Sequence, residues 1–269
     1  MSIYKLSLAG LQKVRDHIQA SLVIPELENQ PSTVSLMDRE EEIPEPTSLD
    51  TLGDLFRAAS DPDDLVSAPN LEGRWFLSSA NPAIALKKIP GLQLQDNFRL
   101  VTYLLRTPKG GQGCTWAVPE FASGTAQLEE ALIDCDRHHT PRPAHSLDDV
   151  MMALTGDSSP SSYLLASLFC REVNEFGGLG TQSHWLNHRL VGKVPAQVKW
   201  EWKVPTPYEN LTPKVRALKD GRMAVEFFTC HTKAPIALYR HLDQYAAHSY
   251  VPKRSDIPIA LATKKIKAS

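Results

Sequence analysis

The sequence predicts an α+β fold built on an antiparallel sheet. Alternating apolar and polar residues indicate strands in two separate regions, residues ~70–118 and ~196–242, while helical spacing dominates the region between them, residues ~124–190. The chain lacks the regular alternation of strands and helices that a parallel doubly wound sheet requires. We therefore expect the two strand regions to share one sheet, with the helical insertion packed on one face.

The N-terminal element, residues 1–25, is predicted to be a short strand followed by a helix. Apolar residues alternate between Tyr4 and Leu8 and then recur at helical spacing between Leu11 and Leu22. This spacing places one apolar stripe on the helix, so we expect the helix to pack against a larger body.

A strongly acidic segment follows, over residues 26–69. Within residues 26–64 there are twelve Asp and Glu residues and two Arg residues, a net charge of −10, although the whole chain carries −2. Self-repulsion, prolines and a scarcity of large apolar residues favour a flexible connector. We expect an α+β domain over residues 70–262 after it, and a basic tail over residues 263–269.

The first strand region is predicted to contain a short strand at residues 74–78 and a hairpin. Residues 98–107 form its clearest strand, and the glycine-rich residues 108–113 lead to a second strand at residues 114–118. Glycines can approach a phosphate where a helix begins. Because a strand follows these glycines, they are interpreted as the flexible tip of the hairpin.

The middle of the chain is predicted to be helical at residues 126–135, 146–154, 160–176 and 183–190. The helix at 160–176 has the clearest boundaries, because Ser159 is placed to cap it and Pro160 suits its first position. Its apolar stripe should face the core and its polar residues should face water: Leu165, Phe169, Val173 and Phe176 inward, and Arg171, Glu172, Asn174 and Glu175 outward.

The second strand region is also basic. Trp200 and Trp202 alternate with lysines at residues 198–204, which predicts that both rings are core residues. Asp220–Gly221 predicts a hairpin turn, and a further helix or strand is expected at residues 236–248. The net charge over 189–222 is +5, and its exposed bases are the expected contacts for a partner: Arg189, Lys193, Lys199, Lys203, Lys214 and Arg216.

Two groups of potential metal ligands stand out: Cys135, His138, His139 and His145, and the pair His184 and His188. The first group lacks a second ligand pair at a fixed spacing, so a polar loop is favoured. The second pair would share one face of a helix, but the glutamate of an HExxH motif is absent. No cofactor or metal is therefore expected, with metal binding by either group left as an alternative.

Catalytic motifs are not evident, which favours a binding protein over an enzyme. The sequence contains no GxSxG motif and no Walker spacing. We expect a non-enzymatic cytoplasmic adaptor, assembly or regulatory factor that recognises another protein partly by charge. The alternatives are a nucleic-acid-binding component that uses the basic face of residues 189–222, and a metal enzyme or hydrolase built on His184 and His188. No membrane partner is expected, because no apolar run reaches about 20 residues.

Overall fold

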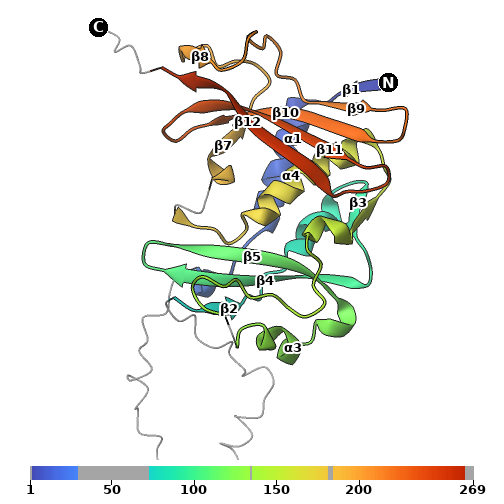
Figure 1. Cartoon of the computed structure of the whole chain (residues 1–269), viewed down its shortest axis with the longest axis vertical. Coiled ribbons are helices and arrows are strands. Elements are labelled where there is room, and N and C mark those ends of the chain that lie inside the picture. Colours follow the sequence, from blue (N-terminus) through green and yellow to red (C-terminus); the bar gives the residue numbers. More distant parts are fainter. Residues whose placement is uncertain (1, 30–72, 134, 181–183, 264–269) are drawn as a thin grey trace, which may run out of the picture.

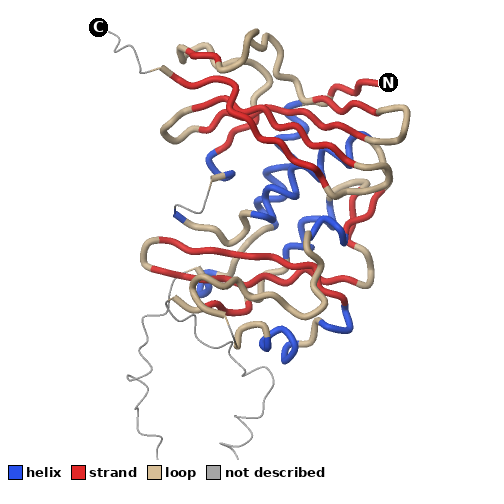
Figure 2. The backbone as a smooth tube through the Cα atoms, viewed as in Figure 1, coloured by secondary structure: helices blue, strands red, loops and turns tan. Residues whose placement is uncertain are grey.

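The computed structural model describes residues 2–29, 73–133, 135–180 and 184–263. These residues form three layers, in which two helices lie between a large antiparallel sheet and a small one (Figure 1). The backbone trace shows the two sheets on opposite sides of the helical layer (Figure 2). The predicted α+β class is therefore confirmed. The predicted flexible connector and basic tail lie almost entirely outside the described residues.

The large sheet has seven strands: β1 (Ser2–Lys5), β7 (His188–Leu190), β8 (Trp200–Trp202), β9 (Lys214–Ala217), β10 (Met223–His231), β11 (Ala237–Tyr245) and β12 (Pro252–Ala262). Its order is β1-β9-β10-β11-β12-β8, and β7 also pairs with β10. The predicted hairpin turn joins β9 to β10, with Gly221 at φ +81°. This backbone conformation favours glycine.

Helices α1 (Leu8–Ser21) and α4 (Pro160–Asn174) form the central layer. Ser159 caps α4 by accepting a hydrogen bond from the backbone N–H of Ser162, as the sequence predicts. The predicted outward orientation of Arg171 and Glu172 is wrong, because both side chains are buried. The physical reason is that α4 lies between two sheets, so its polar side is covered as well as its apolar side.

The small sheet contains β2 (Trp75–Leu77), β4 (Phe98–Thr107) and β5 (Gly110–Pro119). Its strands and those of the C-terminal region belong to separate sheets, which corrects the expected single sheet. The separation arises because the buried helix α4 occupies the space between them. A further two-stranded sheet pairs β3 (Leu92–Leu94) with β6 (Leu154–Gly156).

Residues 108–109 form the turn of the predicted hairpin, but the glycines that follow belong to β5 and are not part of a loose tip. A Cβ atom at Gly113 would lie 2.1 Å from the carbonyl oxygen of Phe176 and 2.7 Å from Cα of Gly177. Only glycine permits this approach of two backbones. The run therefore brings the small sheet against the segment that follows α4.

Three predicted helices are shorter than expected. The first is α3 (Thr125–Glu130), and the second is a 3-10 helix at Val150–Ala153 that leads into β6. The third predicted helix, at residues 183–190, is replaced by a 3-10 helix at Trp185–Asn187 that is followed directly by β7. The chain extends here because β7 pairs with the free edge of β10 beyond the end of β9. Short 3-10 helices also occur at Glu26–Glu28, Pro82–Lys88 and Glu120–Ala122.

Glu28 ties the end of the N-terminal element to the small sheet. Its carboxylate accepts hydrogen bonds from the hydroxyl groups of Ser78 and Ser79, at 2.5 Å and 2.7 Å. Its backbone carbonyl accepts one from Nε of Arg106 at 3.0 Å. The predicted flexible connector thus begins with an ordered anchor.

The main core lies between the large sheet and the helices. It includes Leu11 and Ile18 of α1, Phe169 of α4 and Phe227 of β10. The opposite face of the large sheet is covered by a second cluster, against which Trp200 and Trp202 pack while half-buried. No helix in the described ranges has the length and apolar character needed to cross a membrane.

Candidate functional site

Four neighbouring strands place polar side chains together on the sheet face that packs against α4. His188 of β7 lies opposite His231 of β10, and His241 of β11 lies opposite Asp256 of β12. Thr229 precedes His231 by two residues and therefore points to the same face. The sheet register thus gathers side chains that can transfer protons.

Four of these residues form one continuous chain of hydrogen bonds, which we call the relay. Oδ1 of Asp256 lies 2.7 Å from Nδ1 of His241, and Nε2 of His241 lies 2.7 Å from Oγ1 of Thr229. The same hydroxyl oxygen lies 2.7 Å from Nδ1 of His188. The relay therefore runs from β12 to β7.

The proton positions in the relay follow from its carboxylate end. Asp256 can only accept, so Nδ1 of His241 carries a proton and its Nε2 accepts one from the hydroxyl of Thr229. The hydroxyl oxygen then accepts a hydrogen bond from Nδ1–H of His188. Nε2 of His188 keeps a free lone pair, and no described residue donates a hydrogen bond to it.

Electrostatics keep both imidazoles neutral and the carboxylate charged. Burial, aided by the rings of His241 and His231, lowers the pKa of His188 to about 3. Burial also lowers the pKa of His241, although its hydrogen bond to Asp256 acts in the opposite direction. Burial alone would raise the pKa of Asp256, but the bond from His241 and the charge of Arg171 hold it well below its usual range.

Arg171 of α4 supports the carboxylate end of the relay. Its Nη2 lies 2.5 Å from Oδ1 of Asp256, and its two Nη atoms bind both oxygens of Asp243 at 2.6 Å and 2.8 Å. Burial alone would lower the pKa of Arg171, but these two carboxylates raise it above its ordinary value. Arg171 therefore fixes Asp256 as a charged acceptor.

Arg15 of α1 supports the opposite end. Its Nε lies 2.7 Å from Oε1 of Glu172, and its other nitrogens donate to the backbone carbonyls of Trp185 and His188. Glu172 also accepts a hydrogen bond from Nε1 of Trp185 at 2.7 Å. The indole stacks on the ring of His188 with centroids 5.4 Å apart. A buried ion pair between two helices thus positions both the ring and the backbone at His188.

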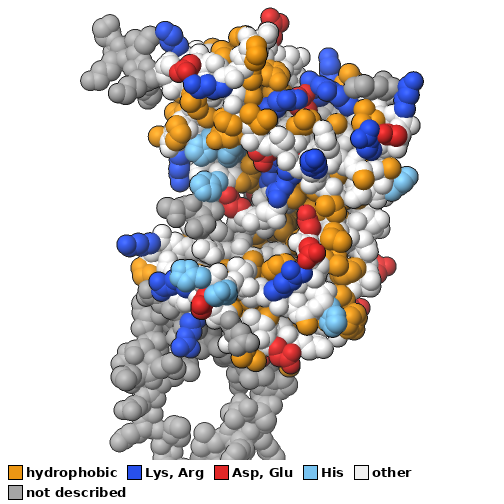
Figure 3. All heavy atoms as spheres, in the orientation of Figure 1, with side chains coloured by type: hydrophobic (Ala, Val, Ile, Leu, Met, Phe, Trp, Pro, Cys, Tyr) orange, Lys and Arg blue, Asp and Glu red, His pale blue; other side chains and the backbone are white. Residues whose placement is uncertain are grey.

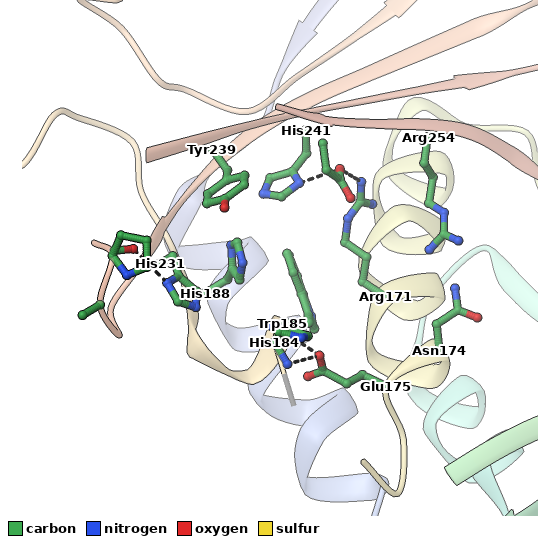
Figure 4. Close-up of a pocket in the computed structure, with 13 residues that line it drawn as sticks. Arg171, Asn174, Glu175, His184, Trp185, His188, His231, Tyr239, His241 and Arg254 are labelled. Carbon is green, nitrogen blue, oxygen red and sulfur yellow. Dashed lines mark hydrogen bonds and ion pairs between the residues drawn. The ribbon is translucent and has the colours of Figure 1, made fainter. Parts of the chain in front are cut away.

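A cavity of about 620 Å³ opens beside the relay, and we call it the relay cavity. Its lining includes Arg171, Asn174, Glu175, His184, Trp185, His188, His231, Tyr239, His241, Arg254 and Asp256. His188, His231 and Tyr239 cluster at one end, and Arg254 and Asn174 lie at the other (Figure 4). The surface view shows neighbouring histidine side chains beneath the left part of the large sheet, with other histidines elsewhere on this face (Figure 3).

One guanidinium beside the relay cavity is free to bind an anion. Its two carboxylates are already satisfied, since Asp256 binds His241 and Arg171, and Glu175 accepts from three consecutive backbone N–H groups beginning at residue 184. Arg254 is exposed and has no carboxylate partner within the described residues. The cavity therefore offers the unpaired guanidinium of Arg254 and the acceptor Nε2 of His188.

The six predicted contact residues lie elsewhere, and none lines the relay cavity in the described part of the chain. Lys214 and Arg216 lie 2.5 Å and 3.3 Å from the buried carboxylate of Glu226, which also pairs with Arg240, so both are already engaged in ion pairs. The other four are exposed around β7 and β8: Arg189, Lys193, Lys199 and Lys203. Their contact with a partner stays a prediction.

The two predicted histidine groups have different surroundings. His138 and His139 are exposed beside Asp136, and the ring of His145 contacts Phe121 with centroids 5.5 Å apart, while Cys135 is half-buried. The pair His184 and His188 is not on a helix, yet both side chains line the relay cavity. Within the described residues, no group of three or more His, Cys, Asp or Glu is arranged to hold a metal ion.

Sequence reasoning missed most of the relay because its members are far apart along the chain. A signal was nevertheless present in the alternation of the strands. Thr229 and His231, and then Tyr239, His241 and Asp243, occupy positions two residues apart. Polar residues repeated on the face of a strand that should be buried indicate a polar site inside the fold.

Comparisons with known proteins do not extend this description. No protein-family model, no curated protein and no solved structure matches the chain. Function must therefore be argued from the geometry of the relay cavity.

Proposed function

We propose that this protein is an enzyme that performs general acid–base chemistry on an anionic substrate in the relay cavity, with His188 as the base. The observation that carries the proposal is the relay itself. It directs the free lone pair of His188 to Nε2, on a side chain that lines the cavity. The relay holds this neutral imidazole in one tautomer, and its low pKa means that a bound anion beside the ring is needed to favour its protonated form.

The support around His188 favours a functional site over a satisfied core histidine. Arg15 and Arg171 are both buried and hold the two ends of the relay from different helices. Such preorganisation fixes a ring in place before a substrate arrives. Perturbed titratable groups that line a cavity are also characteristic of active sites.

The tautomer of His188 and the binding of an anion test this proposal together. In ¹⁵N-labelled protein, imidazole correlation spectra should show the proton of His188 on Nδ1 and a neutral ring from pH 8 to pH 5. Inorganic phosphate should shift the signals of His188 and His231 in a saturable way. Arg254→Gln should weaken this binding by about tenfold, equivalent to about 1.4 kcal/mol.

A matched control is His138→Gln, which replaces an exposed histidine outside the relay cavity. This variant should bind phosphate like the wild type. The proposal fails if the proton of His188 resides on Nε2, or if phosphate leaves the pocket histidines unchanged at millimolar concentrations.

The expected partner protein is a separate proposal, supported by a different observation. Arg189, Lys193 and Lys199 are exposed and form no ion pair with another described residue. Free surface cations increase the rate of association with an acidic partner. Replacing all three with glutamine should reduce capture of an acidic partner at low salt, and equal capture would count against this role.

A further inference from the structure

We infer that the substrate of the relay cavity is RNA, which the protein cleaves by transesterification at a phosphodiester bond. This inference rests on the proposed acid–base function and names its substrate class. Three features of the cavity carry it: the source of the nucleophile, the pairing of two histidines, and a separate cation at the far end.

The first feature is the nucleophile. In the described part of the chain, the cavity lining contains no Ser, Thr or Cys side chain. The hydroxyl of Thr229 is fully buried and already bonded to two histidines. A substrate that supplies the attacking group itself would need no such side chain. RNA carries its own nucleophile, the 2′-hydroxyl, beside the phosphorus that it attacks.

The second feature is the pair of histidines. His231 lies opposite His188 in the sheet, with ring centroids 5.0 Å apart. Nδ1 of His231 lies 3.4 Å from the carbonyl oxygen of Pro235. When the ring is protonated, this contact occupies Nδ1–H and leaves Nε2–H available to donate. The pair can therefore present one proton acceptor and one proton donor to the same phosphate.

The reaction balances with these two groups. Nε2 of His188 accepts the proton of the 2′-hydroxyl while the O2′–P bond forms. The P–O5′ bond breaks, and His231 donates a proton to the departing O5′. The products are a 2′,3′-cyclic phosphate and a 5′-hydroxyl end, and no further reactant is required. Tyr239, whose ring centroid is 4.9 Å from that of His188, is placed to donate a hydrogen bond to a phosphate oxygen.

The third feature is the position of Arg254 at the opposite end from the histidine pair (Figure 4). A single small phosphate would not need both ends of this cavity. A polynucleotide presents successive phosphates, so Arg254 can bind a neighbouring phosphate while cleavage occurs at the histidines. Exposed Lys233, next to cavity-lining Ala234 in the chain, adds positive charge for a polyanion.

The test uses the full chain with a randomised single-stranded RNA oligonucleotide and the same pool made as DNA, both in EDTA. Wild type should cleave the RNA and leave the DNA intact, and mass spectrometry should find cyclic phosphate ends. His188→Gln and His231→Gln should each reduce the rate by about 100-fold or more. Arg254→Gln should mainly raise KM, and His138→Gln, purified in parallel, should cleave at the wild-type rate.

The RNA assignment is overturned if wild type leaves the RNA uncut, if DNA is cut equally, or if the two histidine variants retain the wild-type rate. Thermal unfolding of each variant separates loss of the fold from loss of chemistry. If RNA stays uncut but phosphate still shifts the pocket histidines, only the substrate assignment is lost. If phosphate also has no effect, the proposed function fails with it.

Discussion

The guanidinium of Arg15 and the carboxylate of Glu172 form an ion pair that is almost completely shielded from water, with Nε and Oε1 2.7 Å apart. The pair joins α1 to α4 across the central layer. It therefore makes the N-terminal helix part of the structure that carries the candidate site.

Arg15→Met should destabilise the protein by about 3–5 kcal/mol, because Glu172 would remain as a buried and unpaired charge. Urea unfolding monitored by fluorescence measures this cost. The second substitution Glu172→Gln, added to Arg15→Met, should recover part of it. The control is Lys13→Met on the exposed side of the same helix, which should change stability by less than about 0.5 kcal/mol. A cost for Arg15→Met as small as that of the control would contradict the role assigned to the pair.

Thr229→Val should break the relay without changing the size of the side chain. Two buried imidazole nitrogens would lose their hydrogen-bond partner, and each loss should lower the free energy of unfolding by about 1–3 kcal/mol. The imidazole spectrum of His188 should also lose its single tautomer. Thr229→Ser retains the hydroxyl and should keep that tautomer. If the valine variant also kept it, the hydroxyl would not orient His188.

Stability should fall as the pH drops below about 6.5, because the unfolded state then protonates His188 while the folded state does not. The folded pKa is depressed to about 3, so the loss continues across the window between these values. One such histidine contributes a slope of about 1.4 kcal/mol per pH unit. His188→Gln should flatten the slope between pH 6 and pH 4.5 by roughly this amount in urea titrations. An unchanged slope would mean that His188 titrates normally in the folded protein.

Gly113→Ala should destabilise the protein by several kcal/mol, since its Cβ would overlap the backbone of Phe176. The matched control is Gly10→Ala in α1, where the nearest atom to a new Cβ is 3.7 Å away. That substitution should be neutral or stabilise the helix by up to about 1 kcal/mol. Thermal unfolding of both variants decides the comparison, and similar melting temperatures would show that the backbones can separate.

Local sequence patterns predicted the elements whose signals lie within the element itself. The serine cap and proline start of α4 depend on adjacent residues, and so does the turn at Gly221. The pairing of strands depends on residues far apart, so the sequence could not show that α4 separates two sheets. For the same reason, Arg171 appeared to be a surface residue, although its partners Asp243 and Asp256 come from strands 72 and 85 residues away.

The candidate site was predictable only in part. His184 and His188 stood out through their spacing, but the assumed helix gave the wrong reason for their proximity. His231, His241 and Asp256 carry no local motif, because the sheet register brings them together. The predicted contact residues of the basic region were chosen by charge alone. Their contact with a partner stays a prediction.

The contact between Gly113 and Gly177 also offers a way to recognise distant relatives. Any chain that keeps β5 against the end of α4 must keep very small residues at both places, whatever happens to the rest of its sequence. A search that requires this glycine pair, an arginine six residues before the second glycine, and two aspartates in the last two strands would select for architecture and chemistry together. Sequences found in this way should carry histidine where this chain has His188 and His241.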